Sequence, residues 1–588
     1  MRSSETVLGM LQDRGKRGLP MQDLYRQLYN PQLYLRAYAR LYSNDGAMTK
    51  GTTEETVDGM SLKKIFEIIE LLKQEQFRWT PVRRTYIPKK NRKLRPLGLP
   101  TWTDKLVQEV LRSLLEAYYE PQFSEASHGF RPQRGCHTAL SEIRTGWRGT
   151  HWFIEGDIKA CFDQLNHSVL LDILAEKIHD NRFLRLIKQL LQAGYLEDWR
   201  YHATYSGSPQ GGVVSPLLAN IYLDKLDHYI EKELLPAYTQ GERRNVNPAY
   251  HRIQNRVVSL KKKGKYAQAQ QVKRQLRALP ARDPNDAHFR RLKYVRYADD
   301  TLLGFAGPKS EAEEIKRTLG NFLRDTLKLE LSQEKTLITH AATQPAHFLG
   351  YDIIASFRND RISARGQRDL NGNIRLRLPA EVVEKKRAQY KQKGKPLRRM
   401  RLASQTDYTI LNTYQAEYRG LYQYYQLADN VCWLSRLHWD MQQSLLHTLA
   451  AKYRKSKQAM VHRYHALIET PDGSRGCLRV TQERKGGKKP LIATFGGIAL
   501  KHQKQAILID RLPIPIRYEQ KEVIRRLIAS KCELCTVKSE NAVVHHVRKL
   551  ADLERMGKGR PHWAQIMLKR RRKTLIVCQA CHHTIHQE

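Results

Sequence analysis

Two adjacent carboxylates, Asp299 and Asp300, lie in the motif Tyr297-Ala298-Asp299-Asp300, between two apolar segments rich in β-forming residues. A short link between such segments predicts a β-hairpin whose turn carries both acids. Adjacent carboxylates repel each other and stay ionised together only beside cations. Two Mg²⁺ ions about 3.5–4 Å apart would satisfy them and could drive in-line phosphoryl transfer. The motif alone also leaves open a surface turn with two solvated acids.

A third carboxylate, Asp157, ends the short apolar segment 152–157. A carboxylate at a strand end is a natural further ligand for cations held at Asp299 and Asp300. A lone Asp is more often a turn residue, so this interpretation depends on the combination of three acids. Asp163 precedes a helix predicted from Asn166 onward, and we interpret it as part of the local structure near that helix start.

Two Cys-x-x-Cys pairs lie near the C-terminus, and their spacing is typical of a tetrahedral structural zinc site that stabilises a small domain. The four thiols are Cys532, Cys535, Cys578 and Cys581. Two unrelated pairs are the alternative.

Histidines accompany these pairs. His545 and His546 are adjacent between them, whereas His582 and His586 follow the last cysteine. On a helix, two residues that are four apart share one face.

The composition favours a nucleic acid as partner. Lys and Arg number 102 against 59 Asp and Glu, which gives a formal net charge of +43 over 588 residues. Self-repulsion of this size needs a reason, so a merely soluble basic surface is the weaker explanation. The length predicts several domains. The cysteines form no disulfide framework, and we find neither a transmembrane segment nor a signal-peptide core, so we expect a reducing intracellular compartment and no membrane partner.

Several further segments would position these groups or bind phosphates. Residues 86–100 read as a basic hairpin suited to a triphosphate or a phosphate backbone, with a solvated charged turn as the alternative. Residues 127–135 form a Gly/Pro loop from which Arg131 and Arg134 could reach phosphates. Residues 207–212 form a flexible loop that precedes a helix. A later helical region is dense in tyrosine and basic residues, which suits RNA, although about half of these tyrosines are expected in a helical core.

In this order the motifs resemble the reverse transcriptases encoded by bacterial group II introns. The resemblance spans approximately residues 60–355 and rests on several local sequences. These are Arg95-Pro96-Leu97-Gly98-Leu99-Pro100, Ser127-His128-Gly129-Phe130-Arg131-Pro132, the Ser-Pro-Gln-Gly-Gly loop at 208–212, Tyr297-Ala298-Asp299-Asp300, Ser332-Gln333-Glu334-Lys335-Thr336 and Phe348-Leu349-Gly350-Tyr351.

The resemblance implies roles for individual residues. Asp157, Asp299 and Asp300 would bind two catalytic Mg²⁺ ions, assisted by the Ile158 carbonyl. Phe162 would lie under the sugar C2′ position and reject ribonucleotides. The remaining residues implied to contact the nucleotide or template are Lys89, Arg95, Pro209, Gln210 and Lys335.

The C-terminal residues resemble an HNH, or ββα-metal, nuclease as carried by many of these intron proteins. By that match His546 is the general base, and His545, His582 and His586 ligate one divalent metal at the scissile phosphate, although the two adjacent histidines could be exchanged. The family often has an Asn that orients the base, and here the corresponding place is near Lys573-Thr574. A catalytically dead, zinc-stabilised module is therefore the alternative.

We thus expect an α+β multidomain protein with a right-hand polymerase and a small zinc-stabilised nuclease domain. The expected division is an N-terminal extension (1–60), fingers and palm (61–360, with a basic helical insertion at 238–290), a helical thumb and maturase domain (361–450), a basic DNA-binding segment (451–525) and the nuclease domain (526–588). The expected partners are group II intron RNA, target DNA and deoxynucleoside triphosphates, and the expected location is the bacterial cytoplasm, at the nucleoid when on DNA. The rival functions are an RNA-binding splicing cofactor with vestigial nuclease activity and a domesticated reverse transcriptase.

Overall fold

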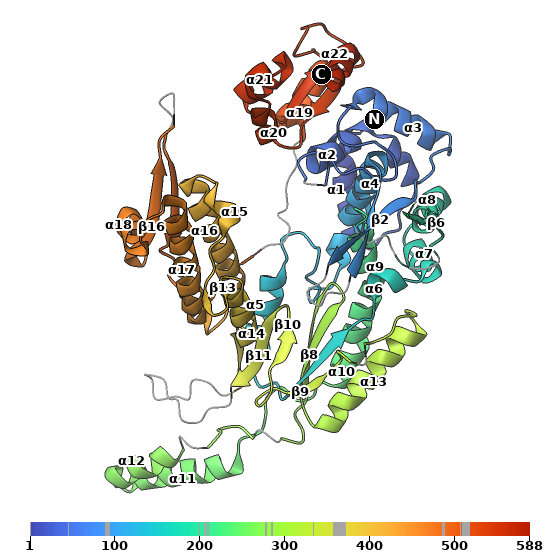
Figure 1. Cartoon of the computed structure of the whole chain (residues 1–588). Helices are drawn as coiled ribbons and strands as arrows, with labels where there is room; N and C mark the ends of the chain where they lie inside the picture. Colours follow the sequence, from blue (N-terminus) through green and yellow to red (C-terminus); the bar gives the residue numbers. More distant parts are fainter. Residues whose placement is uncertain are drawn as a thin grey trace.

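The computed structural model (Figure 1) describes residues 2–44, 46–88, 94–198, 200–204, 207, 211–276, 279–283, 286–332, 334–356, 372–484, 489–505, 507–508 and 518–588. Of the helices in these ranges, none is long and apolar enough to cross a membrane. The N-terminal and C-terminal segments lie side by side at one end of the molecule, and the central sheet lies below them in the view of Figure 1.

The N-terminal region is helical and contributes to the main hydrophobic core. It contains α1 (Ser4–Lys16), α2 (Pro31–Leu41), α3 (Leu62–Lys73) and α4 (Trp102–Tyr119). The buried positions of α3 (Ile65, Ile68, Ile69 and Leu72) recur at helical spacing, and the Ser61 hydroxyl caps the helix by accepting the Lys64 N–H at 3.1 Å. Tyr34 and Tyr38 of α2 are fully buried, so the tyrosines of this polar-looking region are core residues.

A basic hairpin follows, as predicted. Strand β2 (Val82–Pro88) pairs with β3 (Leu94–Leu99), and its tip at residues 89–93 lies outside the described part of the chain. The sheet is extended by β5 (Tyr195–Glu197), which is parallel to β2, and by β6 (Arg200–His202).

The central sheet has the strand order β7-β8-β4-β9. Its strands are β4 (Trp152–Asp157), β7 (Arg291–Tyr297), β8 (Asp300–Ala306) and β9 (Ile338–His340). Successive side chains point to opposite faces of a strand. Accordingly, Ile154 joins a core shared with the N-terminal helices, whereas Phe153 joins a second core under the later helices. Both faces are covered, which fixes the register and hence the strand-end side chains.

Helices flank this sheet. They include α5 (Cys136–Gly146), α6 (Cys161–Gln164), α7 (His167–Ala175), α8 (Asn181–Gln192), α9 (Ser215–Tyr229) and α13 (Lys309–Asp325). Helix α7 begins directly after Asn166, as predicted, and the Asn166 side chain caps it by accepting the Val169 N–H at 3.1 Å. The basic segment predicted to be helical contains α11 (Pro248–Lys262) and α12 (Tyr266–Gln275), which project from the lower end of the molecule in Figure 1.

A second body follows the central sheet. It contains a small sheet of β10 (Ala346–Phe348), β11 (Tyr351–Ser356) and β12 (Asn373–Arg377), then α14 (Ala380–Ala388), α16 (Asp407–Tyr425), α17 (Leu434–Tyr453) and α18 (Lys457–Tyr464). An antiparallel sheet of β15 (His465–Thr470), β16 (Gly473–Gln482) and β17 (Leu491–Gly496) packs on α16. Tyr414, Tyr418 and Tyr425 are buried in this core, which agrees with the expectation that part of the tyrosines serve packing.

The C-terminal domain is small and continuous with the N-terminal region. Its elements are α19 (Glu522–Ala529), β18 (Val543–His546), α20 (Leu550–Arg555), α21 (His562–Arg570), β19 (Thr574–Val577) and α22 (Gln579–Gln587). Strand β18 lies between β19 and the two-residue strand β1 (Met60–Ser61). Val544 and Ile576 belong to the same core as the N-terminal helices.

Candidate active sites

The three carboxylates singled out from the sequence meet at one edge of the central sheet. Asp300 begins β8 and is the register partner of both Tyr297 on β7 and Asp157 on β4. Asp157 is the last residue of its strand, as predicted. The link Ala298-Asp299 closes the hairpin, with Ala298 in the left-handed region at φ +56°.

The electrostatics of this edge favour cations. Burial, followed by the charges of Asp299 and Asp157, raises the pKa of Asp300 to about 6. Burial also raises the pKa of Asp299, and the charges of Arg95 and Lys335 oppose this shift. The Lys335 ammonium lies 3.0 and 2.9 Å from the two carboxylate oxygens of Asp157. An ammonium thus supplies part of the positive charge that three converging acids require, and the donor set of carboxylate oxygens is one that Mg²⁺ prefers.

The other predicted nucleotide-site residues lie around these acids. Phe162, on α6, is half-buried against the main core, with its ring centroid 6.3 Å from that of Phe130. Ile158 is buried and forms a β-bridge with Leu331, which joins the end of β4 to the segment carrying Lys335. Arg95 is on β3, opposite Ile87.

Lys89, Pro209 and Gln210 lie outside the described residues. Next to the last two, a Cβ added at Gly211 would come within 2.4 Å of the Gly98 carbonyl oxygen. The loop backbone therefore packs directly on β3, and glycine is required at that contact.

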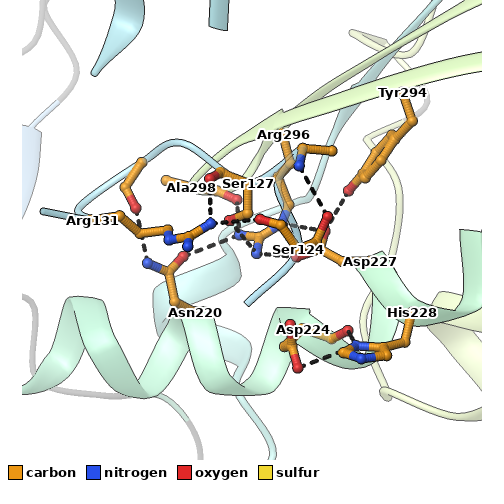
Figure 2. A network of polar contacts seen from close by, with 12 residues as sticks. Ser124, Ser127, Arg131, Asn220, Asp224, Asp227, His228, Tyr294, Arg296 and Ala298 are labelled. Carbon is orange, nitrogen blue, oxygen red and sulfur yellow. Dashed lines mark hydrogen bonds and ion pairs between the residues drawn. The ribbon is translucent and has the colours of Figure 1, made fainter. Parts of the chain in front are cut away.

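A buried ion pair holds the hairpin turn from below (Figure 2). Arg296 and Asp227 are both fully buried, with Nε to Oδ1 at 2.7 Å and Nη2 to Oδ2 at 2.5 Å. The same guanidinium donates to the Ala298 carbonyl at 2.9 Å, to Asn220 Oδ1 at 3.1 Å and to Ser127 Oγ at 2.9 Å. Tyr294 donates to Asp227 at 2.8 Å. The turn that carries Asp299 is thus fixed to α9 by a network in which every group has a partner.

Residues 127–131 pack against the other side of the turn. A Cβ at Gly129 would lie 2.4 Å from the Ala298 amide nitrogen, so this loop approaches the turn as closely as a backbone can. Arg131 donates to the carbonyls of Ser124 and Ser127 at 2.5 and 2.8 Å and is 4% exposed. Its charge therefore stabilises the loop, and the expectation that Arg131 reaches phosphates is wrong.

The four C-terminal cysteines converge. One sulfur from each lies within 4.8 Å of every other, and Cys535 Sγ is 3.8 Å from Cys578 Sγ. Sulfurs bound about 2.3 Å from a tetrahedral zinc are about 3.8 Å apart. The donor set and its spacing therefore fit a zinc ion, which Cys532, Cys535, Cys578 and Cys581 would hold.

The histidines form a second convergent group. His545 on β18 and His582 and His586 on α22 bring ring nitrogens within 4.8 Å of one another, together with the carboxylate of Asp58 from the N-terminal region. Burial alone would raise the pKa of Asp58, but close contacts with the imidazoles of His545 and His582 hold the pKa well below its usual range. Sequence reasoning missed Asp58 because residues 53–59 carry no motif.

His546 points away from this group. Its ring is 5% exposed, and its Nε2 lies 2.8 Å from the Tyr38 hydroxyl. Burial lowers the pKa of His546 to about 3. Thr574 is its cross-strand partner, at the place predicted for the missing Asn, but the Thr574 hydroxyl accepts a hydrogen bond from Arg526 at 2.7 Å. In this arrangement Tyr38 is the hydrogen-bond partner of the His546 ring.

Three family models match the chain in succession. Residues 87–353 match Reverse transcriptase (RNA-dependent DNA polymerase), residues 380–475 match Type II intron maturase, and residues 532–582 match AI2M/AI1M-like, HNH endonuclease. The chain is also 40% identical to the Group II intron-encoded protein LtrA of Lactococcus lactis subsp. cremoris, over 96% of each chain. The chain belongs to the group II intron-encoded proteins.

More distant relatives agree with this assignment. The intron-encoded protein is 34% identical to an uncharacterised 91 kDa protein in a cob intron of Schizosaccharomyces pombe, over 99% of this chain and 73% of the relative. It is 35% identical to a putative COX1/OXI3 intron 1 protein of Saccharomyces cerevisiae, over 72% of this chain and 52% of the relative. It is therefore an RNA-directed DNA polymerase and an intron maturase that acts in splicing and intron mobility, and it carries a DNA endonuclease domain. A splicing cofactor with vestigial enzymatic sites is not favoured.

Proposed function

We propose that the intron-encoded protein extends a DNA primer at the sheet edge that carries Asp157, Asp299 and Asp300. The observation that supports this most directly is the register of Asp157 opposite Asp300, with Asp299 in the turn beside them. Two Mg²⁺ ions bound there would neutralise the developing charge on the primer 3′-oxygen and on the leaving pyrophosphate.

The surrounding side chains would position the nucleotide. Arg95 on its β-strand, with Lys89, would bind the triphosphate as fixed cations. Phe162 would form the floor under the sugar, where its bulk leaves no room for a 2′-hydroxyl. Lys335 would leave Asp157 when Mg²⁺ binds, because the cation replaces its charge, and would then be free to contact the nucleotide. Pro209, Gln210 and the Ile158 carbonyl complete the proposed set.

We further propose that the central sheet and basic hairpin are the palm and fingers and that the helices from α14 to α17 are the thumb. The helical segment 238–290 would be an insertion in the palm, and residues 451–525 would contact target DNA. Intron RNA would lie along the basic faces of these parts, gripped through its phosphates and by stacking. The proposed site of action is the bacterial cytoplasm.

The C-terminal domain would make the primer. His545, His582 and His586 would hold one divalent cation at the scissile phosphate, and His546 would accept a proton from the attacking water. The Cys₄ zinc would hold β18, β19 and α22 in the arrangement that brings these histidines together. Cleavage of one DNA strand leaves a 3′-end that the polymerase site extends along the intron RNA.

Primer extension on an RNA template tests the polymerase proposal. Asp299→Ala should abolish deoxynucleotide incorporation while leaving RNA binding at the wild-type level, because the RNA contacts lie elsewhere. Asp325→Ala removes an exposed carboxylate at the end of α13 and should leave both unchanged. Normal incorporation by Asp299→Ala would show that this carboxylate holds no catalytic cation.

A further inference from the structure

A carboxylate from the N-terminal region lies among the histidines of the nuclease domain. His586 Nε2 is 2.7 Å from Oδ2 of Asp58, whereas His545 Nδ1 and His582 Nε2 are 3.2 and 3.4 Å from Oδ1. The Nε2 atoms of His582 and His586 are 3.3 Å apart. Four possible metal ligands from the two ends of the sequence thus surround one point.

The spacing of these atoms is that of a coordination sphere. Ligands bound about 2.0–2.1 Å from a tetrahedral metal lie about 3.3–3.4 Å from one another. Hydrogen bonding alone does not account for the group. The Nδ1 atom of the buried His545 faces Asp58 Oδ1 at 3.2 Å without the geometry of a hydrogen bond, and its Nε2 has no hydrogen-bond partner within the described part of the chain. An unpartnered buried imidazole nitrogen is costly, and a divalent cation at this point would satisfy Nδ1, the His545 nitrogen that faces Asp58.

The main chain holds Asp58 in this place. The Gly59 N–H donates to the Val544 carbonyl at 3.0 Å, and Met60 pairs with Val544 in the three-stranded sheet. The His546 N–H donates to Asp58 Oδ1 at 2.6 Å. Val57 and Met60 are fully buried on either side. The carboxylate is therefore delivered to the histidines by strand pairing and by packing.

We propose that Asp58 is the fourth ligand of the cation at His545, His582 and His586, and that this ligand holds the nuclease site closed against the N-terminal region. We call this bond between Asp58 and the cation the latch. The inference rests on the proposed nuclease role of these histidines. A catalytic site with three protein ligands keeps its fourth position for substrate, and Asp58 fills that position. Tyr38 covers His546 on the same contact surface. Cleavage then requires a DNA phosphate to displace Asp58 and β18 to leave the two-residue strand β1.

Hydrogen exchange of the full-length protein, with and without Mn²⁺, tests the latch. Mn²⁺ favours carboxylate ligands such as Asp58, whereas the thiolate site selects zinc. The readout is the exchange of the peptides that contain Gly59 and residues 543–546. At a Mn²⁺ concentration ten times the dissociation constant, mass action lowers the open population, and hence the exchange rate, by about tenfold.

Asp58→Ala should abolish this effect of Mn²⁺, and it should nick DNA faster than the wild type at saturating Mn²⁺. Asp58→Asn keeps the size of the side chain but is a weaker ligand, so it should lose most of the effect too. Glu54→Ala is the matched control, since Glu54 lies four residues earlier and its side chain is 87% exposed. It should retain the full effect.

Slowing of exchange by Mn²⁺ to the same extent in Asp58→Ala, or no slowing in the wild type, would overturn the latch. Retained DNA synthesis by each variant shows that the chain is folded. The proposed nuclease function fails separately: if the wild type and Asp58→Ala both leave target DNA intact while Mn²⁺ still slows exchange through Asp58, the latch stands and the cleavage assignment does not.

Discussion

Replacement of Arg296 by methionine tests whether the buried network under the Asp299 turn positions the polymerase site. Methionine has a similar length but no charge. The substitution leaves Asp227 buried without its guanidinium partner. The Tyr294 hydroxyl is then its remaining partner among the residues drawn in Figure 2, and the Ala298 carbonyl loses its hydrogen bond from Arg296. Breaking a buried ion pair by removing one partner costs about 3–5 kcal/mol. We expect the free energy for opening of the β7–β8 hairpin to fall by this amount.

The chain has more than one hydrophobic core, so a single unfolding midpoint would mix several transitions. Native-state hydrogen exchange of the amides at 291–306 reports the hairpin itself. The double variant Arg296→Met/Asp227→Leu removes both charges. Its loss in the free energy of hairpin opening should be clearly smaller than the sum of the losses in the two single variants. In the same preparations, Arg296→Met should lower DNA synthesis more than it lowers RNA binding.

Arg324→Met is the matched control, because the side chains of Arg324 and of its partner Asp325 are 62% and 64% exposed. A surface pair of this kind contributes about 0–1 kcal/mol. The role that we give to this ion pair would be refuted by either of two results. One is a loss in the free energy of hairpin opening below about 1 kcal/mol for Arg296→Met; the other is a loss in the double variant equal to the sum of the losses in the single variants.

Two further predictions concern the metal sites. Cys581→Ser should lose the bound zinc, measured as zinc per chain, and should lose nicking while keeping extension of a primer supplied in advance; full zinc content would contradict the Cys₄ site. Because the pKa of Asp300 is raised to about 6, protons compete with Mg²⁺ below that pH. At pH 5.5 the Mg²⁺ concentration for half-maximal DNA synthesis should be about fourfold higher than at pH 8, and an unchanged requirement would contradict this carboxylate as a ligand.

The local parts of the fold could be predicted from the sequence. The hairpin around Asp299, the strand that ends at Asp157 and the helix capped by Asn166 all follow from patterns within about ten residues. The convergence of the four cysteines follows from their spacing, because two Cys-x-x-Cys pairs have few other uses in a domain of this size.

Contacts between distant segments could not be predicted in this way. Strand β1 has two residues, and nothing near Met60 indicates that it would pair with Val544.

Buried charges were missed for a related reason. Arg296 and Arg131 look like any basic residue in a basic chain, and their partners lie on other elements. Tyr38 lies in the expected N-terminal extension, and nothing near it in the sequence indicates that it packs in the main core or forms a hydrogen bond with His546.

A coupled assay on target DNA, with the protein bound to its intron RNA, tests the central claim that two separate metal centres make and extend the primer. Nicking and extension are measured in one reaction. Asp299→Ala should nick the DNA and add no nucleotides. His586→Ala should leave the intact duplex uncut but extend a strand that has already been nicked. Extension by Asp299→Ala, or loss of both activities in either variant, would contradict the separation of the two centres.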